Sequence, residues 1–182
     1  MLILHGWGAD STSNWFPWLK QQLEQKGITA YCPNLPSSML PRKAAWLEAA
    51  RKAVGKYDES LSIIGHSLGA VAILRILESF GKGEKIDKAI LVSGFAKNVG
   101  LLEINDFFRG AYDFVKIRKN ANKFFVINSD DDPFVPLSYG EEMAKQLNAK
   151  FLVEHKAGHI NAGTGHLSYQ RVLELLEEKN ES

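Results

Sequence analysis

A serine lies between two glycines at the point where a strand-like segment gives way to a helical one. The run Leu61–Ile64 is apolar and rich in β-branched residues, and the helical pattern of Ser67–Phe80 follows almost at once. A Gly-x-Ser-x-Gly motif between a strand and a helix holds its serine in a strained turn, with the hydroxyl clear of the sheet. We expect Gly65 and Gly69 to be required because a Cβ at either position would collide with the neighbouring strand or helix. The motif therefore predicts that Ser67 is a nucleophile.

A nucleophilic serine needs a base and a carboxylate, which follow it here in the order that the motif demands. Asp132 comes just after the strand-like segment Phe124–Asn128, and His159 comes after Phe151–Glu154. Ligands bind at the carboxyl ends of the strands in open parallel sheets, so both side chains are expected at one edge. We predict that His159 takes the Ser67 proton and that Asp132 orients the imidazole.

Three consecutive aspartates compete for the role of the acid. Asp132 is favoured because a proline follows it and biases it towards an extended conformation. The pattern Asp-Pro-x-Val-Pro, which hydrolases place after this strand, also aligns on Asp132. Asp130 and Asp131 are interpreted as turn or capping residues, with Asp131 as the alternative acid.

Three histidines compete for the role of the base. His155 lies in or at the end of the last predicted strand, and His166 lies near the start of the final predicted helix. Only His159 occupies the Gly-His turn at which the base is expected in hydrolases. A histidine near the amino terminus, His5, is interpreted as structural and hydrogen-bonded to loop backbone.

A His-Gly-x-Gly loop follows the first predicted strand. In hydrolases such a loop supplies one donor of an oxyanion hole, and the residue after the nucleophile supplies the other. The backbone N–H groups of Trp7 and Leu68 are therefore predicted to bind the negative oxygen of a tetrahedral intermediate. The indole of Trp7 forms part of the pocket wall or packs in the core, and the sequence does not separate the two.

The chain resembles the small serine-hydrolase family of the α/β-hydrolase superfamily, which includes the retinoblastoma-binding serine hydrolase, over nearly its whole length. The resemblance rests on the motifs above and on the more specific segment Asn14–Leu19. It implies Ser67 as nucleophile, Asp132 as acid and His159 as base. The vertebrate member's Leu-x-Cys-x-Glu motif is missing from Lys56–Leu61, where it would be expected, so the binding of retinoblastoma-type pocket proteins is not carried over.

Strand-like and helical segments alternate along the chain, which favours a parallel sheet. We predict an α/β-hydrolase fold with a minimal six-stranded parallel sheet in the order 2-1-3-4-5-6, helices on both faces and no large lid domain. The 182 residues suit one buried core, so a single domain over 1–182 is expected. The predicted strands are Leu2–His5, Thr29–Cys32, Leu61–Ile64, Ala89–Ser93, Phe124–Asn128 and Phe151–Glu154; the predicted helices are Asn14–Lys26, Pro41–Gly55, Ser67–Phe80, Pro136–Leu147 and Ser168–Lys179.

The segment Gly94–Asn122 has two interpretations. Its large apolar residues are spaced as one or two short amphipathic helices, and most are expected to pack on the sheet as in any crossover. Alternatively, the segment crosses above the site and lines an acyl pocket. It is short for a separate lid, so a shallow, open site is predicted. The residues concerned are Phe95, Leu101, Leu102, Phe107, Phe108, Tyr112 and Phe114.

Composition narrows the possible partners. The formal net charge is +1 with acids and bases interspersed, which argues against nucleic-acid binding. A single cysteine, Cys32, excludes an internal disulfide and suits a reducing compartment. The absence of a long apolar run argues against a membrane span and a signal peptide, so a cytoplasmic protein is expected. We expect a monomer or small homo-oligomer without metal or organic cofactor.

The motifs together predict two-step acyl transfer through an acyl-enzyme on Ser67. Small carboxylic esters are the predicted substrates, with amides or aminoacyl esters as alternatives. A second hypothesis is a non-catalytic or weakly active protein-interaction module on a hydrolase scaffold, because a fold alone does not establish activity.

Overall fold

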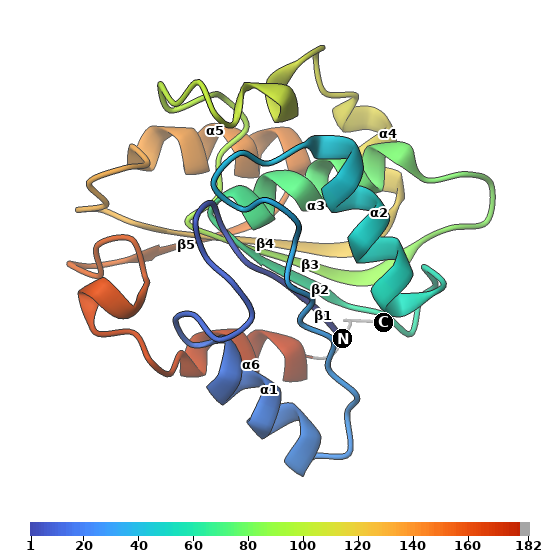
Figure 1. Ribbon diagram of the computed structural model, residues 1–182, viewed down its shortest axis with the longest axis horizontal. Coiled ribbons are helices and arrows are strands. Elements are labelled where there is room, and N and C mark those ends of the chain that lie inside the picture. The colour runs from blue at the N-terminus through green and yellow to red at the C-terminus, as the bar shows by residue number, and fades with distance from the viewer. Residues whose placement is uncertain (179–182) are drawn as a thin grey trace.

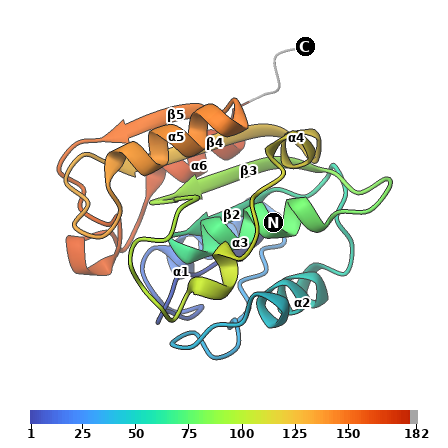
Figure 2. The ribbon, with the colours of Figure 1, turned by 90° about the horizontal axis from the view of Figure 1, so that it is seen from above.

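Five parallel strands form one sheet, and helices cover both of its faces (Figure 1). The computed structural model describes residues 1–178. Helices α2, α3, α4 and α5 lie on one face of the sheet, and α1 and α6 lie on the other (Figures 1 and 2). This arrangement confirms the predicted parallel sheet with helices on both faces.

The strands are β1 (Leu2–Leu4), β2 (Ile63–His66), β3 (Ile86–Val92), β4 (Ala121–Ser129) and β5 (Lys150–Glu154). The helices are α1 (Phe16–Gln25), α2 (Lys43–Val54), α3 (Leu68–Ser79), α4 (Phe114–Lys119), α5 (Leu137–Leu147) and α6 (Gln170–Glu177), with short 3₁₀ turns η1 (Asn105–Phe108) and η2 (Ala162–Thr164).

The predicted helices all form, within a few residues of the expected bounds. Ser67 and Phe80 flank α3 as its caps rather than lying inside it. The final helix ends at Glu177, and Lys179, the last residue of its predicted range, lies outside the described residues.

Between β3 and β4 the chain forms only η1 and α4, so no large lid domain is present in that segment.

The prediction of six strands is wrong, because Thr29–Cys32 pairs with β1 at one residue only. Tyr31 donates from its amide to the Met1 carbonyl (2.9 Å) and accepts from the Ile3 amide (2.8 Å), which is a single parallel bridge. The next rung of this ladder would need an N–H from Pro33 to the Ile3 carbonyl. Proline has no N–H, so the pairing stops there. The bridge still places this segment beside β1, the neighbour that the predicted order gave it.

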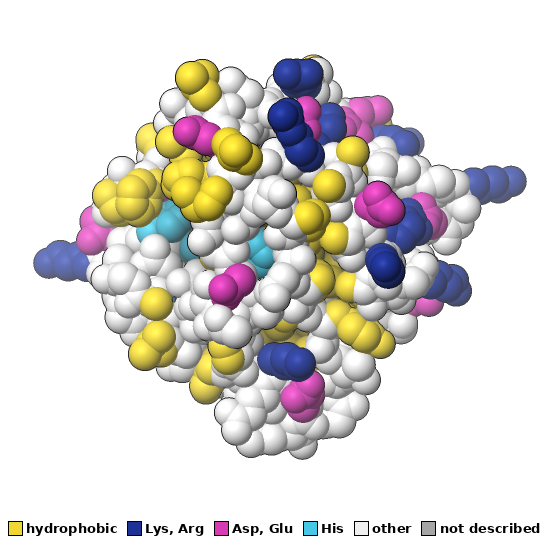
Figure 3. All heavy atoms as spheres, in the orientation of Figure 1, with side chains coloured by type: hydrophobic (Ala, Val, Ile, Leu, Met, Phe, Trp, Pro, Cys, Tyr) yellow, Lys and Arg dark blue, Asp and Glu magenta, His cyan; other side chains and the backbone are white. Residues whose placement is uncertain are grey.

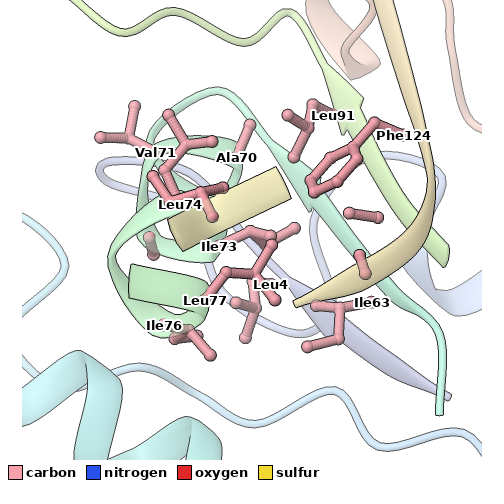
Figure 4. Packing of buried hydrophobic residues seen from close by; sticks show 14 of the residues in the cluster. Leu4, Ile63, Ala70, Val71, Ile73, Leu74, Ile76, Leu77, Leu91 and Phe124 are labelled. Atoms are coloured by element: carbon pink, nitrogen blue, oxygen red, sulfur yellow. The ribbon is translucent and has the colours of Figure 1, made fainter. Parts of the chain in front are cut away.

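Helix α3 is the centre of the larger hydrophobic core. Every residue from Leu68 to Leu77 is buried, because the sheet covers one side of the helix and α2, α4 and η1 cover the other. Figure 4 shows Ile73, Leu74 and Leu77 of α3 packed among residues of the strands. Burying a side chain of this size contributes about 1.5–3 kcal/mol, so this packing anchors the helix that begins at Ser67.

The parallel arrangement brings the three candidate catalytic segments to one edge. The turn at Ser67 follows β2, the aspartates follow β4, and the loop with His159 follows β5. All three therefore leave the sheet at the carboxyl ends of its strands, where ligands bind in folds of this kind. Among residues 1–178 no helix is both long and apolar enough to cross a lipid bilayer.

Candidate active site

Ser67 sits in a strained turn between β2 and α3. Its backbone has φ 55° and ψ −121°, a conformation that a residue with a Cβ adopts only when its surroundings enforce it. A Cβ on Gly65 would lie 2.5 Å from the Gly69 carbonyl carbon, and a Cβ on Gly69 would lie 2.7 Å from the His5 carbonyl oxygen. The predicted need for both glycines is therefore confirmed. The Ser67 amide donates to the Val92 carbonyl (2.8 Å), which fixes the turn to β3.

Asp132 and His159 form a buried hydrogen-bonded pair. His159 Nδ1 lies 2.7 Å from Asp132 Oδ2, and the Asp132 side chain is completely buried. The other carboxylate oxygen accepts hydrogen bonds from the amides of Phe134 (2.9 Å) and Val135 (3.0 Å). Because an ionised carboxylate only accepts, Nδ1 carries the proton, which leaves Nε2 of the neutral ring free to take one.

The other two aspartates have different partners. Asp131 accepts from Ser129 Oγ (2.7 Å) and from the Gly158 amide (2.7 Å), and these two bonds hold the pKa of its carboxyl below the usual range. Asp130 lies 2.6 Å from His155 Nδ1 at the surface. Asp132, and not the alternative Asp131, is therefore the aspartate that contacts His159.

The two competing histidines lie outside this pair. His155 is largely exposed, and its ion pair with Asp130 raises its pKa. His166 is hydrogen-bonded only locally, with its Nδ1 3.1 Å from Thr164 Oγ1. Neither borders the cavity that contains Ser67.

Residues 157–162, here called the base loop, are held by side chains from distant parts of the chain. The His159 carbonyl accepts from His66 Nε2 (2.8 Å) and from Ser93 Oγ (3.2 Å), at the ends of β2 and β3. The Ile160 carbonyl accepts from Trp15 Nε1 (3.0 Å) in a buried hydrogen bond. These bonds fix the backbone on either side of the His159 side chain.

His66 is a neutral, buried histidine. Its burial, and the nearby His159 to a lesser degree, lower its pKa to about 3. A carbonyl only accepts, so the bond to the His159 backbone places the proton of His66 on Nε2. Its Nδ1 is then an acceptor, and this buried atom has no hydrogen-bond partner among the described residues.

The loop after β1 brings Trp7 next to the serine. His5 is completely buried; it accepts from the Leu35 amide at Nε2 (2.9 Å) and so donates from Nδ1 to the Gly6 carbonyl (2.9 Å). This agrees with the structural interpretation of His5. Within residues 1–178, the amides of Trp7 and Leu68 take part in no backbone hydrogen bond between elements. Both residues border the same cavity as Ser67, and Trp7 also packs against the larger hydrophobic core, so both interpretations of Trp7 hold.

Ser67 and His159 both line a cavity of about 270 Å³, which we call the apolar cavity. In Figure 3 histidine side chains are visible near the middle of this face, with hydrophobic side chains gathered beside them below α5. In the described chain no hydrogen bond joins the Ser67 hydroxyl to His159, which is common before substrate binds. The other residues that line the apolar cavity are Trp7, Leu68, Phe95, Val99, Leu101, Ile104, Phe134, Val135 and Asn161.

In the segment between β3 and β4, some residues pack in the core and others line the pocket, so each of the two interpretations holds for different residues. Phe95 and Leu101 line the apolar cavity, as the second interpretation predicts. Phe107 is buried in the core against Trp46, as the first predicts. Leu102 does neither, because it is 80% exposed.

A larger cavity of about 450 Å³ lies at the opposite edge of the sheet, near the starts of β4 and β5, and contains none of these residues. No three His, Cys, Asp or Glu side chains among residues 1–178 gather in a way that could hold a metal ion.

Comparison with known proteins identifies the family. The family described as serine hydrolase matches residues 1–178. The chain belongs to the serine hydrolase family. YdeN of Bacillus subtilis (strain 168) is 37% identical over 175 residues, which cover 96% of this chain and 92% of YdeN. The serine hydrolase RBBP9 of Rattus norvegicus is 30% identical over 159 residues, which cover 86% of this chain and 83% of RBBP9.

Solved structures agree with this assignment. The crystal structure of the ydeN gene product from B. subtilis superposes with a TM-score of 0.91 and covers 96% of this chain and 95% of that one. A meta-cleavage product hydrolase from Pseudomonas fluorescens IP01 has a TM-score of 0.68 at 15% identity, over 98% of this chain and 91% of that one, and shows the fold alone. The fold is that of the α/β-hydrolases, as predicted.

Sequence reasoning missed the residues that hold the base loop. Trp15 lies in the segment Asn14–Leu19, on which the family resemblance rests, but the resemblance assigned no role to this residue. His66 immediately precedes Ser67, but its bond to the His159 backbone spans 93 positions. Ser129 Oγ accepts from the Ala157 amide (3.0 Å) at the start of the base loop. Ser93 and Ser129 carry no local signal, because their roles depend on which loops the fold brings together.

Proposed function

We propose that this protein is an esterase that hydrolyses small carboxylic esters through an acyl-enzyme on Ser67. The observation that carries the proposal is the buried Asp132–His159 pair, 2.7 Å apart, whose histidine borders the same cavity as Ser67 on its strained turn. A serine, a histidine with a free Nε2 and a buried carboxylate are the groups that acyl transfer requires. Membership of the serine hydrolase family supports the same chemistry.

The first half-reaction acylates the serine. Ser67 Oγ attacks the ester carbonyl while His159 Nε2 takes its proton, and the Asp132 carboxylate stabilises the imidazolium. The amides of Trp7 and Leu68 hold the oxyanion. Each such donor lowers the barrier by about 3–4 kcal/mol. The intermediate then collapses, the C–O bond to the alcohol breaks, and His159 gives its proton to the departing oxygen.

The second half-reaction restores the enzyme. A water molecule replaces the alcohol, His159 removes a proton from it, and the resulting hydroxide adds to the acyl carbon. Collapse of this intermediate releases the carboxylic acid and returns the proton to Ser67 Oγ. The overall change is ester plus water to acid plus alcohol, so no oxidant, reductant or cofactor is consumed.

The apolar cavity favours small esters over large lipids. Its volume of about 270 Å³ is near the lower end of the range for small-molecule sites, and its lining is mostly hydrophobic. Amides and aminoacyl esters fit the same chemistry and remain the alternative substrates. An amine is a poorer leaving group than an alcohol, which places esters first.

Hydrolysis of p-nitrophenyl butyrate tests the proposal. Wild type should turn over the ester and show a transient mass increase of one butyryl group on the peptide with Ser67. Ser67→Ala should lose both signals. Ser79→Ala, the same substitution at the far end of α3, is the matched control and should keep both.

The second candidate is a binding module with an idle site. Such a module would also fit the described structure, in which no hydrogen bond joins the Ser67 hydroxyl to His159. A folded wild type without turnover and without an acylated Ser67 would support this candidate and contradict the esterase proposal.

A further inference from the structure

A second cavity meets the apolar cavity at the catalytic serine. It has a volume of about 240 Å³ and lies between the loop after β1 and the base loop. Ser67, His159, Trp7 and Asn161 border both cavities. We call the second one the polar cavity, because its wall consists mainly of small residues and polar side chains, namely those of Ser13, Asn14, His66 and Asn161.

The polar cavity offers two amide groups with unused donors. Asn14 Oδ1 accepts from the Ala162 amide (3.0 Å), and Asn161 Oδ1 accepts from the Thr164 amide (3.1 Å). These bonds fix which end of each side chain is oxygen. Among the described residues neither Nδ2 has a hydrogen-bond partner, so both are available to an oxygen atom in the cavity.

No lysine, arginine, aspartate or glutamate lines the polar cavity. His66, which forms part of its wall, is neutral because burial lowers its pKa to about 3. An ionic group on a bound molecule would lose part of its water there without meeting a permanently charged side chain of opposite sign, which disfavours it relative to a neutral group. The cavity therefore suits a neutral group with oxygen acceptors.

The linings of the two cavities decide which part of an ester lies in each. Ser67 and His159 border both cavities, so the departing oxygen lies within reach of His159 Nε2, which protonates it, whichever cavity holds the alcohol. The apolar cavity extends to Leu68, Phe95 and Ile104 and suits a hydrocarbon acyl chain, whereas the polar cavity suits a hydroxylated group. The alcohol part then points into the polar cavity and the acyl chain into the apolar one.

We propose that the polar cavity is an alcohol subsite that takes a neutral, hydroxylated alcohol such as glycerol, esterified with an apolar acid. Asn14 and Asn161 donate hydrogen bonds to hydroxyl oxygens of the alcohol. This inference rests on the proposed function, and the reaction remains ester plus water to acid plus alcohol.

Four butyrate esters with one acyl group and different alcohols test the inference. Propyl butyrate and glyceryl 1-monobutyrate differ only by two hydroxyl groups, butyrylcholine adds a cation, and the butyrate ester of glycolate adds an anion. We expect kcat/KM for the glyceryl ester to exceed that of the propyl ester about tenfold, the effect of one well-placed hydrogen bond. Both charged esters should fall below the propyl ester.

Asn161→Ser is the variant that isolates the amide donor. Serine is a good helix N-cap and keeps the capping role of Asn161 at η2 while removing Nδ2. The glyceryl-to-propyl ratio of kcat/KM should fall about fivefold. Asn122→Ser makes the same change on an exposed residue of β4 and should leave the ratio as in wild type.

The outcomes separate the two proposals. Hydrolysis of none of the four esters would contradict the esterase proposal itself. Equal kcat/KM for the propyl and glyceryl esters in wild type would overturn the alcohol subsite and leave the esterase proposal standing. A ratio unchanged in a folded Asn161→Ser would also overturn the subsite.

Discussion

Three adjacent aspartates have identical side chains and different partners. Asp130 pairs with a surface histidine, Asp131 binds the Gly158 amide, and Asp132 is buried against His159. The difference comes from the turn after β4, in which Pro133 follows Asp132 and the next two amides close on its carboxylate. The chemistry of each carboxylate is therefore set by backbone geometry within a few residues.

Substitution of neighbouring aspartates tests this distinction. Asp132→Asn should lower kcat for p-nitrophenyl butyrate by about 10⁴-fold, because an amide at this position favours the wrong tautomer of His159. Asp131→Asn should have a small effect, because its amide oxygen still accepts from the Gly158 amide. The opposite pattern would move the acid to Asp131.

At the scale of elements, the base loop depends on a residue at the start of the chain. Trp15 precedes α1, and its indole donates to the Ile160 carbonyl across 145 positions. Ile160 has φ 47°, which is unfavourable for a β-branched residue and must be enforced by such contacts. The hydrogen bonds that offset this strain therefore also hold His159 in place.

Two tryptophan substitutions separate this positioning role from general stability. Trp15→Phe leaves the buried Ile160 carbonyl unpaired, which costs about 1–3 kcal/mol of unfolding free energy. It should also lower kcat about tenfold or more at nearly constant KM, because His159 is misplaced. Trp46→Phe removes a comparable, partly buried bond to the Pro36 carbonyl (2.8 Å) and should lose stability alone. Equal kcat values in the two variants would refute the positioning role of Trp15.

At the scale of the whole molecule, contacts set by strand order were predictable and contacts between loops were not. The pairing of Asp132 with His159 follows from two strand ends at one edge of a parallel sheet. The extra strand at Thr29–Cys32 was expected from local pattern, and Pro33 limits it to one bridge. The bond from Trp15 to Ile160 depends on how two loops pack, which no local pattern records.

Buried neutral histidines make the stability of the whole molecule depend on pH. Burial lowers the pKa of His66 to about 3, and it also lowers the pKa of His5. Below a pH of about 6.5 the unfolded chain binds a proton that folded His66 does not, so the stability that comes from its neutral state is present above that pH and is lost as pH falls towards 3. Within this window His66 lowers the free energy of unfolding by up to about 1.4 kcal/mol per pH unit, and His5 acts in the same direction.

Urea unfolding at pH 7.5, 6.0 and 5.0 measures this dependence. Wild type should lose unfolding free energy more steeply than His66→Gln, which keeps a donor for the His159 carbonyl and has no titrating ring. Parallel curves for the two proteins would show that His66 is not held neutral by burial.

Labelling with a fluorophosphonate probe shows whether Ser67 is an activated nucleophile, because the probe reacts with activated serines. We expect that purified wild type is labelled at Ser67, that Ser67→Ala is not labelled, and that His159→Ala is labelled far more slowly. A folded wild type without label, or equal labelling of Ser67→Ala, would contradict the assignment of Ser67 as nucleophile.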